Sequence, residues 1–118
     1  MRRVAWTDLA CSITIHDEPR GAIVVVEGDA DLNSADILRG ELERALSGRD
    51  QVLVDLTGTT LLDSRTIGVL AAAIEKLRDA GRTMPIVSDD ANVLRLFATL
   101  GLDSEFSFYP SREAAFAA

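Results

Sequence analysis

The sequence predicts an α/β fold, because short apolar stretches rich in β-branched residues alternate along the chain with longer amphipathic ones. Residues 22–28 and 51–56 form the apolar runs expected of buried strands. Residues 64–80 repeat apolar side chains at helical spacing, and Gly81 ends that pattern. A chain of 118 residues fits one domain that buries a core of its own.

The first elements are expected to form a hairpin. Residues 12–16 alternate between apolar and polar side chains, which predicts a strand. Residues 17–21 have the composition of a turn, and residues 22–28 predict a second, central strand. Strands separated by so short a turn pair antiparallel.

A helix is predicted to follow an acidic loop over residues 29–34. Asn33 or Ser34 would cap this helix, which is expected over residues 35–46. Gly48 suits the position just beyond its end, where glycine adopts the left-handed conformation most readily.

The second half repeats the alternation of strand and helix. A third strand runs into a polar turn, and either Asp63 or Ser64 caps the helix that begins there. The remaining predicted elements are a strand at residues 85–88, a helix from residue 91 to Gly101, a strand at residues 106–109 and a final helix beginning at residues 110–113. This order favours parallel strand pairs joined by crossovers.

Composition narrows the classes of function. The net charge is -7, which argues against nucleic-acid binding and leaves room for a protein partner with a basic patch. Cys11 is the only cysteine, so no disulfide within the chain is expected. No signal peptide and no apolar run long enough to span a bilayer are visible, and a soluble cytoplasmic domain is therefore expected, with no membrane insertion.

Catalysis is poorly supported, and we expect no enzyme, no cofactor and no metal site. His16 is the only histidine and is placed at a strand end, without a partner acid or nucleophile in the pattern. Cys11 follows apolar residues and is expected to be a small buried hydrophobe. Gly58 and Gly68 do not form a phosphate-binding loop, and no spacing suggests metal ligands.

The start of the helix after Asp63 is the candidate functional position. A helix N-terminus presents unpaired N–H groups and a partial positive charge, so a phosphate placed there would be held favourably. Asp63 and Ser64 could equally be a cap and nothing more. Asp29 and Asp31 are either local turn residues or an acidic rim at the same sheet edge, where the carboxyl ends of parallel strands meet.

Two blocks of the sequence resemble those of STAS domains. Residues 27–31 with Ala35, Leu38 and Arg39 resemble the "G-(E/D)-x-D…A…L-R" block. Residues 54–56, 62–64 and 68–70 resemble the block that contains "D-(S/T)-x-G-(L/I)-x-x-L". The order of elements agrees from about residue 12 to residue 116, which implies a single STAS-like domain over residues 1–118. The resemblance implies a small mixed β-sheet with about four helices packed on it.

A stand-alone STAS domain of this length is most similar to bacterial anti-sigma factor antagonists, also called anti-anti-sigma factors. The resemblance implies transcription regulation through binding of an anti-sigma factor with serine kinase activity, which releases a sigma factor. It implies that phosphorylation of Ser64 switches binding off and that a phosphatase resets it. Arg65 and Thr66 depart from the family's usual small residue and glycine, and Thr66 is the second candidate acceptor. The residues expected to contact the partner are Asp29, Asp31, Asp63, Ser64, Arg65 and Ile67.

Two other classes of function remain open for a STAS domain. One is the accessory subunit of an ABC-type lipid-transport complex. The other is a nucleotide-binding regulatory module. The oligomeric state does not follow from the sequence.

Overall fold

The computed structural model of the protein describes residues 2–118, and Met1 lies outside the described residues. Its eleven elements are, in chain order, β1 (Arg2–Thr7), β2 (Cys11–Glu18), β3 (Gly21–Ala30), α1 (Leu32–Gly48), β4 (Val52–Asp55), β5 (Thr59–Leu62), α2 (Ser64–Asp79), β6 (Ile86–Val87), α3 (Ala91–Thr99), β7 (Phe108–Tyr109) and α4 (Arg112–Ala117). This alternation confirms the α/β class. Among residues 2–118, seven strands form one mixed sheet that carries four helices.

The sheet combines an antiparallel half with a parallel half. Its strand order is β1-β2-β3-β4-β6-β7, and β5 pairs with β3 beyond the end of β4. Strands β2 and β3 form the predicted antiparallel hairpin, and β1 extends it as the edge strand. The pairs β3–β4, β3–β5, β4–β6 and β6–β7 are all parallel. Strand β3 is therefore the centre on which both halves meet.

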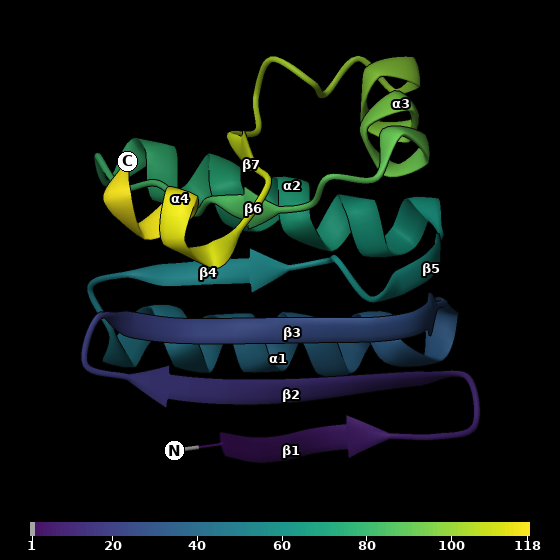
Figure 1. Ribbon diagram of the computed structural model, residues 1–118, viewed down its shortest axis with the longest axis horizontal. Helices are drawn as coiled ribbons and strands as arrows, with labels where there is room; N and C mark the ends of the chain where they lie inside the picture. Colours follow the sequence, from purple (N-terminus) through teal and green to yellow (C-terminus); the bar gives the residue numbers. More distant parts are fainter. Residues whose placement is uncertain (1) are drawn as a thin grey trace.

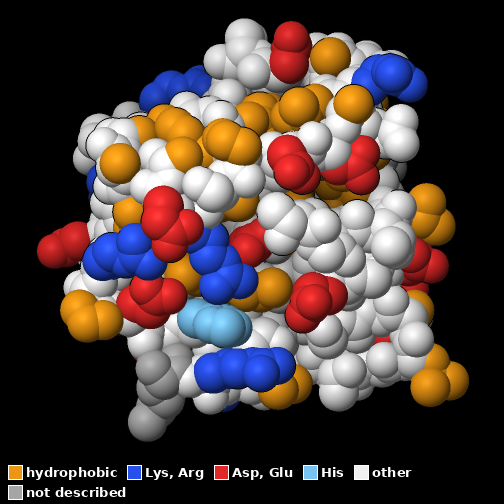
Figure 2. Space-filling view, in the orientation of Figure 1, with side chains coloured by type: hydrophobic (Ala, Val, Ile, Leu, Met, Phe, Trp, Pro, Cys, Tyr) orange, Lys and Arg blue, Asp and Glu red, His pale blue; other side chains and the backbone are white. Residues whose placement is uncertain are grey.

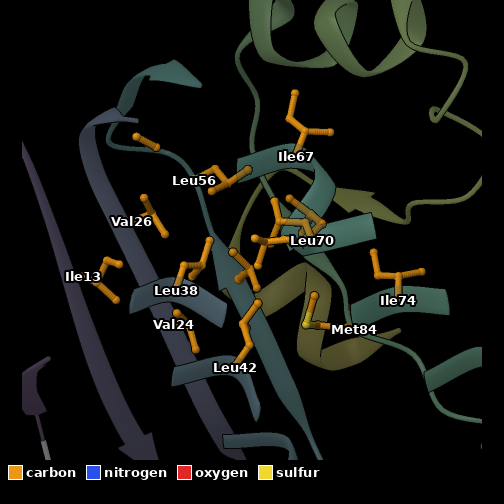
Figure 3. Packing of buried hydrophobic residues seen from close by; sticks show 14 of the residues in the cluster. Ile13, Val24, Val26, Leu38, Leu42, Leu56, Ile67, Leu70, Ile74 and Met84 are labelled. Atoms are coloured by element: carbon orange, nitrogen blue, oxygen red, sulfur yellow. The ribbon is translucent and has the colours of Figure 1, made fainter. Parts of the chain in front are cut away.

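Helices cover both faces of the sheet, α1 and α2 on one and α4 on the other (Figure 1). The main core lies under α1 and α2, where Ile13, Val24 and Val26 of the sheet face Leu38 and Leu42 of α1 (Figure 3). A second, smaller core lies under α4 and contains Ile23, Val25, Leu53, Val87 and Ala115. Because β3 and β4 are buried on both faces, their sequences read as continuous apolar runs rather than as alternating patterns.

The predicted helix ends are confirmed in the second half of the chain and corrected in the first. Gly81 and Gly101 follow α2 and α3 with φ angles of 72° and 73°, as expected of residues that close a helix. The helix predicted over residues 35–46 is longer and begins at Leu32, because Asp31 rather than Asn33 or Ser34 is its N-cap. Gly48 is the last helical residue and does not lie beyond the helix.

Two strands are absent from the sequence prediction. Strand β1 was not predicted, and β5 was predicted as part of a polar turn. Strand β5 positions the start of α2, because it carries the chain from the end of β4 along β3 to that helix. Within residues 2–118, no helix combines the length and the apolar character that crossing a bilayer requires.

Candidate functional site

The predicted functional residues meet at the edge of the sheet where β3 and β5 end and α2 begins. Strand β5 runs beside the end of β3, with Asp29 opposite Leu61. The backbone N–H of Asp63 then donates to the carbonyl of Ala30 over 3.2 Å. The expectation that Asp29 and the start of this helix share one sheet edge is therefore confirmed. We call this region, with Asp29, Asp31, Leu61, Asp63 and Ser64, the switch edge.

Asp63, not Ser64, is the N-cap of α2. Its carboxylate accepts a hydrogen bond of 2.9 Å from the backbone N–H of Thr66. Ser64 is the first residue of the helix and is exposed, and its hydroxyl makes no hydrogen bond within residues 2–118. Asp63 and Ser64 thus have different roles at the start of α2. Asp63 satisfies the backbone, which leaves the hydroxyl of Ser64 available to a partner.

The two positions that follow Arg65 do not have the roles predicted for them. Arg65 is exposed beside Ser64. Thr66 was predicted as the second phosphate acceptor, but its side chain is only 1% exposed, so a kinase cannot reach its hydroxyl in the folded chain. Ile67 was predicted as a partner contact, but it is 1% exposed and belongs to the main core. Both follow from the helical turn, which directs these side chains into the interior of the domain.

Besides Asp63, the other two acidic residues of the switch edge are also held by hydrogen bonds. Asp29 lies within β3 rather than in a loop, and its carboxylate accepts from the hydroxyl of Thr60. Asp31 accepts from the backbone N–H groups of Asn33 and Ser34 at 2.9 and 3.2 Å. Ser34 returns the bond, because its hydroxyl oxygen accepts from the N–H of Asp31 at 3.0 Å. This capping box fixes the direction of Asp31 while leaving it half-exposed.

Two leucines add apolar surface that was not predicted. Leu61 of β5 is 65% exposed, and Leu9, in the turn between β1 and β2, is fully exposed. That turn lies against the switch edge, because the N–H of Asp29 donates to the carbonyl of Ala10 over 2.8 Å. Hydrophobic and acidic side chains stand out along the right-hand side of the molecule in Figure 2, where β5 and this turn lie.

A signal for Leu61 exists in the sequence. Leu61 and Leu62 are consecutive, and consecutive side chains of a strand point to opposite faces, so the two could not both join the main core. The signal is readable only once residues 59–62 are known to be a strand. Nothing comparable marks Leu9, which is a single apolar residue within a turn.

A close approach of two backbones holds the turn in place. Gly28 has a φ of 88°, and a Cβ on it would lie 2.1 Å from the carbonyl oxygen of Ala10. Only glycine combines that conformation with that contact. Gly28 therefore brings Leu9 to the switch edge.

The one cysteine lies beside the switch edge, whereas the one histidine lies further along β2. Cys11 is buried at the start of β2, and burial raises the pKa of its thiol although a hydrogen bond with Ser34 acts in the opposite direction. A raised pKa leaves less of the thiolate that a nucleophile needs. His16 lies in β2 opposite Arg2 of β1. Among residues 2–118, no three His, Cys, Asp or Glu side chains lie together as metal ligands.

Comparisons with known proteins agree with this architecture. Residues 13–108 match the family model described as "Mlab, STAS domain". An anti-sigma factor antagonist from Mycobacterium paratuberculosis is 24% identical in sequence, with 92% of each chain covered and a TM-score of 0.81. The unphosphorylated form of the anti-sigma factor antagonist SpoIIAA is 14% identical, covers 87% of this chain and 92% of its own, and gives a TM-score of 0.72.

The phosphorylated form of the Bacillus SpoIIAA protein is similar as well. It is 13% identical, covers 87% of this chain and 96% of its own, and gives a TM-score of 0.68. At these identities the likeness to solved structures shows a shared fold. No curated protein gave a significant match.

Proposed function

The chain belongs to the STAS domain family, and from that premise we propose that it is an anti-sigma factor antagonist that phosphorylation of Ser64 switches off. One observation carries the proposal. The hydroxyl of Ser64 is exposed and unbonded as the first residue of a 16-residue helix, at an edge that also presents acidic and apolar side chains. The proposed role is that of a binding protein, without catalysis of its own.

Charge explains how phosphorylation would act at this position. A phosphate adds about -1.5 to -2 charges at pH 7. The first turn of α2 tolerates this, because its free N–H groups and the helix dipole favour an anion. A partner surface shaped around the neutral hydroxyl would instead bury a dianion beside Asp63. An uncompensated buried charge costs several kcal/mol, roughly a hundredfold or more in affinity.

The switch edge also suggests what the partner looks like. The carboxylates of Asp29, Asp31 and Asp63 suit basic side chains on an anti-sigma factor. The exposed side chains of Leu9 and Leu61 suit a shallow apolar pocket between those basic side chains. Exposed Arg65 lies next to Ser64 and would partly neutralise the phosphate. We therefore expect a shallower switch than a small residue at position 65 would give. A serine kinase activity on the anti-sigma factor and a separate phosphatase complete the cycle.

The experiment combines modification with binding. Each candidate anti-sigma factor kinase of the source organism is incubated with the chain and ATP, and mass spectrometry locates the phosphate. Binding of the unmodified chain, Ser64→Ala and Ser64→Glu to the kinase is then measured by calorimetry. We expect phosphate on Ser64, full binding by Ser64→Ala and weak binding by Ser64→Glu.

A matched control separates position from charge. Ser104 is exposed in the loop after α3, away from the switch edge, so Ser104→Glu adds the same charge elsewhere. It should bind like the unmodified chain. Equal binding by Ser64→Ala and Ser64→Glu, or phosphate only at other residues, would leave Ser64 as an ordinary helix residue. Stable association with an ABC transporter subunit instead would favour the lipid-transport alternative.

A further inference from the structure

A groove of about 500 Å³ runs between α1 and α2, away from the switch edge. Its floor contains Leu42 of α1 with Val69 and Leu77 of α2. Along α2 and its C-cap Ala80, the lining begins at Val69, more than a helical turn beyond Ser64. This volume lies within the range of small-ligand sites, roughly 300–1,000 Å³.

Small side chains keep the groove open. Ala72 and Ala73 lie along the side of α2 that lines the groove, and the C-cap Ala80 follows on that side. Larger apolar residues there would fill the space between the helices. Ala72 and Ala80 are exposed, so the groove presents hydrocarbon to solvent rather than a closed core.

The lining favours a chain-like apolar ligand over a ring or a sugar. Among the described residues that line it, none has an aromatic side chain on which a base could stack, and only Ser47 carries a hydroxyl. Ligands such as nucleotides are oriented by several convergent polar groups, which this groove does not offer. Aliphatic walls of this kind suit an alkyl chain.

The rim of the groove is basic, although the chain as a whole carries a charge of -7. Three of the lining residues are cations, Arg39, Lys76 and Arg82, against the single acid Glu43. Two of the cations already have partners. Arg39 pairs with Asp36 at 2.9 Å, and the guanidinium of Arg82 donates to backbone carbonyls at the end of α1, including that of Arg49 at 2.7 Å.

Lys76 is the cation that remains. It is exposed, forms no ion pair within residues 2–118 and is the only lysine in the sequence. The carboxylate of Glu43, on the α1 side of the rim, also forms no ion pair within residues 2–118. The guanidinium of Arg82 keeps its charge when it donates to neutral carbonyls, so the rim retains a net positive charge that matches one anionic group on an aliphatic chain. An acidic helix of a partner protein would instead require several free cations along the groove.

We propose that the groove between α1 and α2 binds a single-chain monoanionic amphiphile, a long-chain fatty acid, with its carboxylate at Lys76 and its alkyl chain over Val69 and Leu42. Binding of this kind does not depend on Ser64. Ser64→Ala and Ser64→Glu should bind the acid equally, so failure of the proposed switch and failure of this proposal are distinguishable.

The single lysine makes the test direct. Amine-reactive acetylation can modify only Lys76 and the N-terminal amine, and mass spectrometry separates the two. Palmitate below its micellar concentration should slow acetylation of Lys76 and leave the N-terminal amine unaffected. Hexadecanol, which has the same chain without the charge, should protect much less. Equal protection by both, or none by palmitate, would overturn the proposal.

Variants test the charge and the groove separately through displacement of a fluorescent fatty acid. Lys76→Glu should weaken binding about five- to tenfold, as expected for reversing one exposed charge. Arg78→Glu reverses a charge on the same helix outside the groove and should change nothing. Ala73→Leu should weaken binding by filling the groove, and thermal melting checks that it still folds.

Two outcomes would contradict the proposal at this stage. The first is equal binding by Lys76→Glu and Arg78→Glu with Ala73→Leu also unaffected, which would place the acid elsewhere. The second is protection of Lys76 by an acidic amphipathic peptide but not by palmitate, which would assign the groove to a protein partner.

Discussion

Arg112 donates a hydrogen bond of 2.6 Å from its Nε to Oδ2 of Asp55, and so ties the last helix to the end of β4. The other carboxylate oxygen accepts from the backbone N–H and the hydroxyl of Thr57, at 2.9 and 2.7 Å. Asp55 is only 3% exposed, yet both of its oxygens are satisfied. The buried carboxylate thus joins α4, β4 and the turn that leads to β5.

This arrangement predicts a loss of stability in acid. Burial alone raises the pKa of Asp55, but the hydrogen bonds from Thr57 and Arg112 outweigh it and hold the pKa below the ordinary 3.8. The ionised group therefore stabilises the fold above the unfolded pKa, and this contribution is lost as the pH falls through the lower, folded pKa. Urea unfolding should show a constant stability difference between the chain and Asp55→Asn from about pH 5 to 7 that shrinks below about pH 4. Parallel curves at every pH would contradict this.

Gly28 should not tolerate a side chain. Gly28→Ala places a Cβ 2.1 Å from the carbonyl oxygen of Ala10 and forces a φ of 88° on an ordinary residue. We expect a loss of about 2 kcal/mol or more in the free energy of unfolding. The matched control is Gly68→Ala in α2, where a Cβ meets nothing within 4 Å and stability should rise by up to about 1 kcal/mol. Similar effects of both changes in urea denaturation would refute the close contact.

Two buried threonines should respond to valine in opposite ways. The hydroxyl of Thr66 is buried without a hydrogen-bond partner among the described residues, whereas the hydroxyl of Thr59 donates to the carbonyl of Val26 over 2.8 Å. Thr66→Val should therefore stabilise the chain by about 1 kcal/mol and Thr59→Val should destabilise it by about 1 kcal/mol. Differential scanning calorimetry gives both values. Destabilisation by Thr66→Val would mean that its hydroxyl is satisfied in solution.

Asp31 allows charge to be removed without removing the helix cap. Asparagine caps a helix about as well as aspartate, so Asp31→Asn should change the free energy of unfolding by less than about 0.5 kcal/mol. If the proposed partner is basic, the variant should associate more slowly with the anti-sigma factor and depend less on salt. Asp103→Asn removes an exposed charge elsewhere and serves as the control. Stopped-flow rates and salt slopes that match the unchanged chain would remove Asp31 from the contact surface.

A single glycine predicted the ends of two helices correctly, whereas Gly48, predicted to lie beyond α1, is its last residue. Gly81 and Gly101 stand alone after α2 and α3, and both ends were predicted correctly. The start of α1 was not, because Asp31, Asn33 and Ser34 can all cap a helix. The choice among them depends on how far β3 extends, and that is set by pairing with β5, a contact distant in sequence.

The candidate site was predicted in part for the same reason. Ser64 and Asp63 follow from a local pattern, and the structure places them as expected at the start of α2. Leu9 reaches the switch edge only through the tertiary contact between Gly28 and Ala10, which leaves no trace in a local pattern. The burial of Ile67 agrees with the apolar repeat at helical spacing in residues 64–80, and it rules out the predicted contact of Ile67 with a partner. Thr66 lies one position earlier on the same buried side of α2.

Strand β3 holds two partner strands end to end, β4 along its first half and β5 along its last residues. Three hydrogen bonds fix the turn between β4 and β5. The N–H of Gly28 donates to the carbonyl of Gly58, and the N–H of Thr59 donates to the carbonyl of Leu56. The hydroxyl of Thr59 donates to the carbonyl of Val26. The segment that leads to Ser64 is therefore held against β3 before any partner arrives. Phosphorylation of Ser64, as proposed, would therefore act without a slow rearrangement of this part of the backbone. The response time of the cell would then depend on the kinase, on the phosphatase and on dissociation of the complex, with no folding step in between.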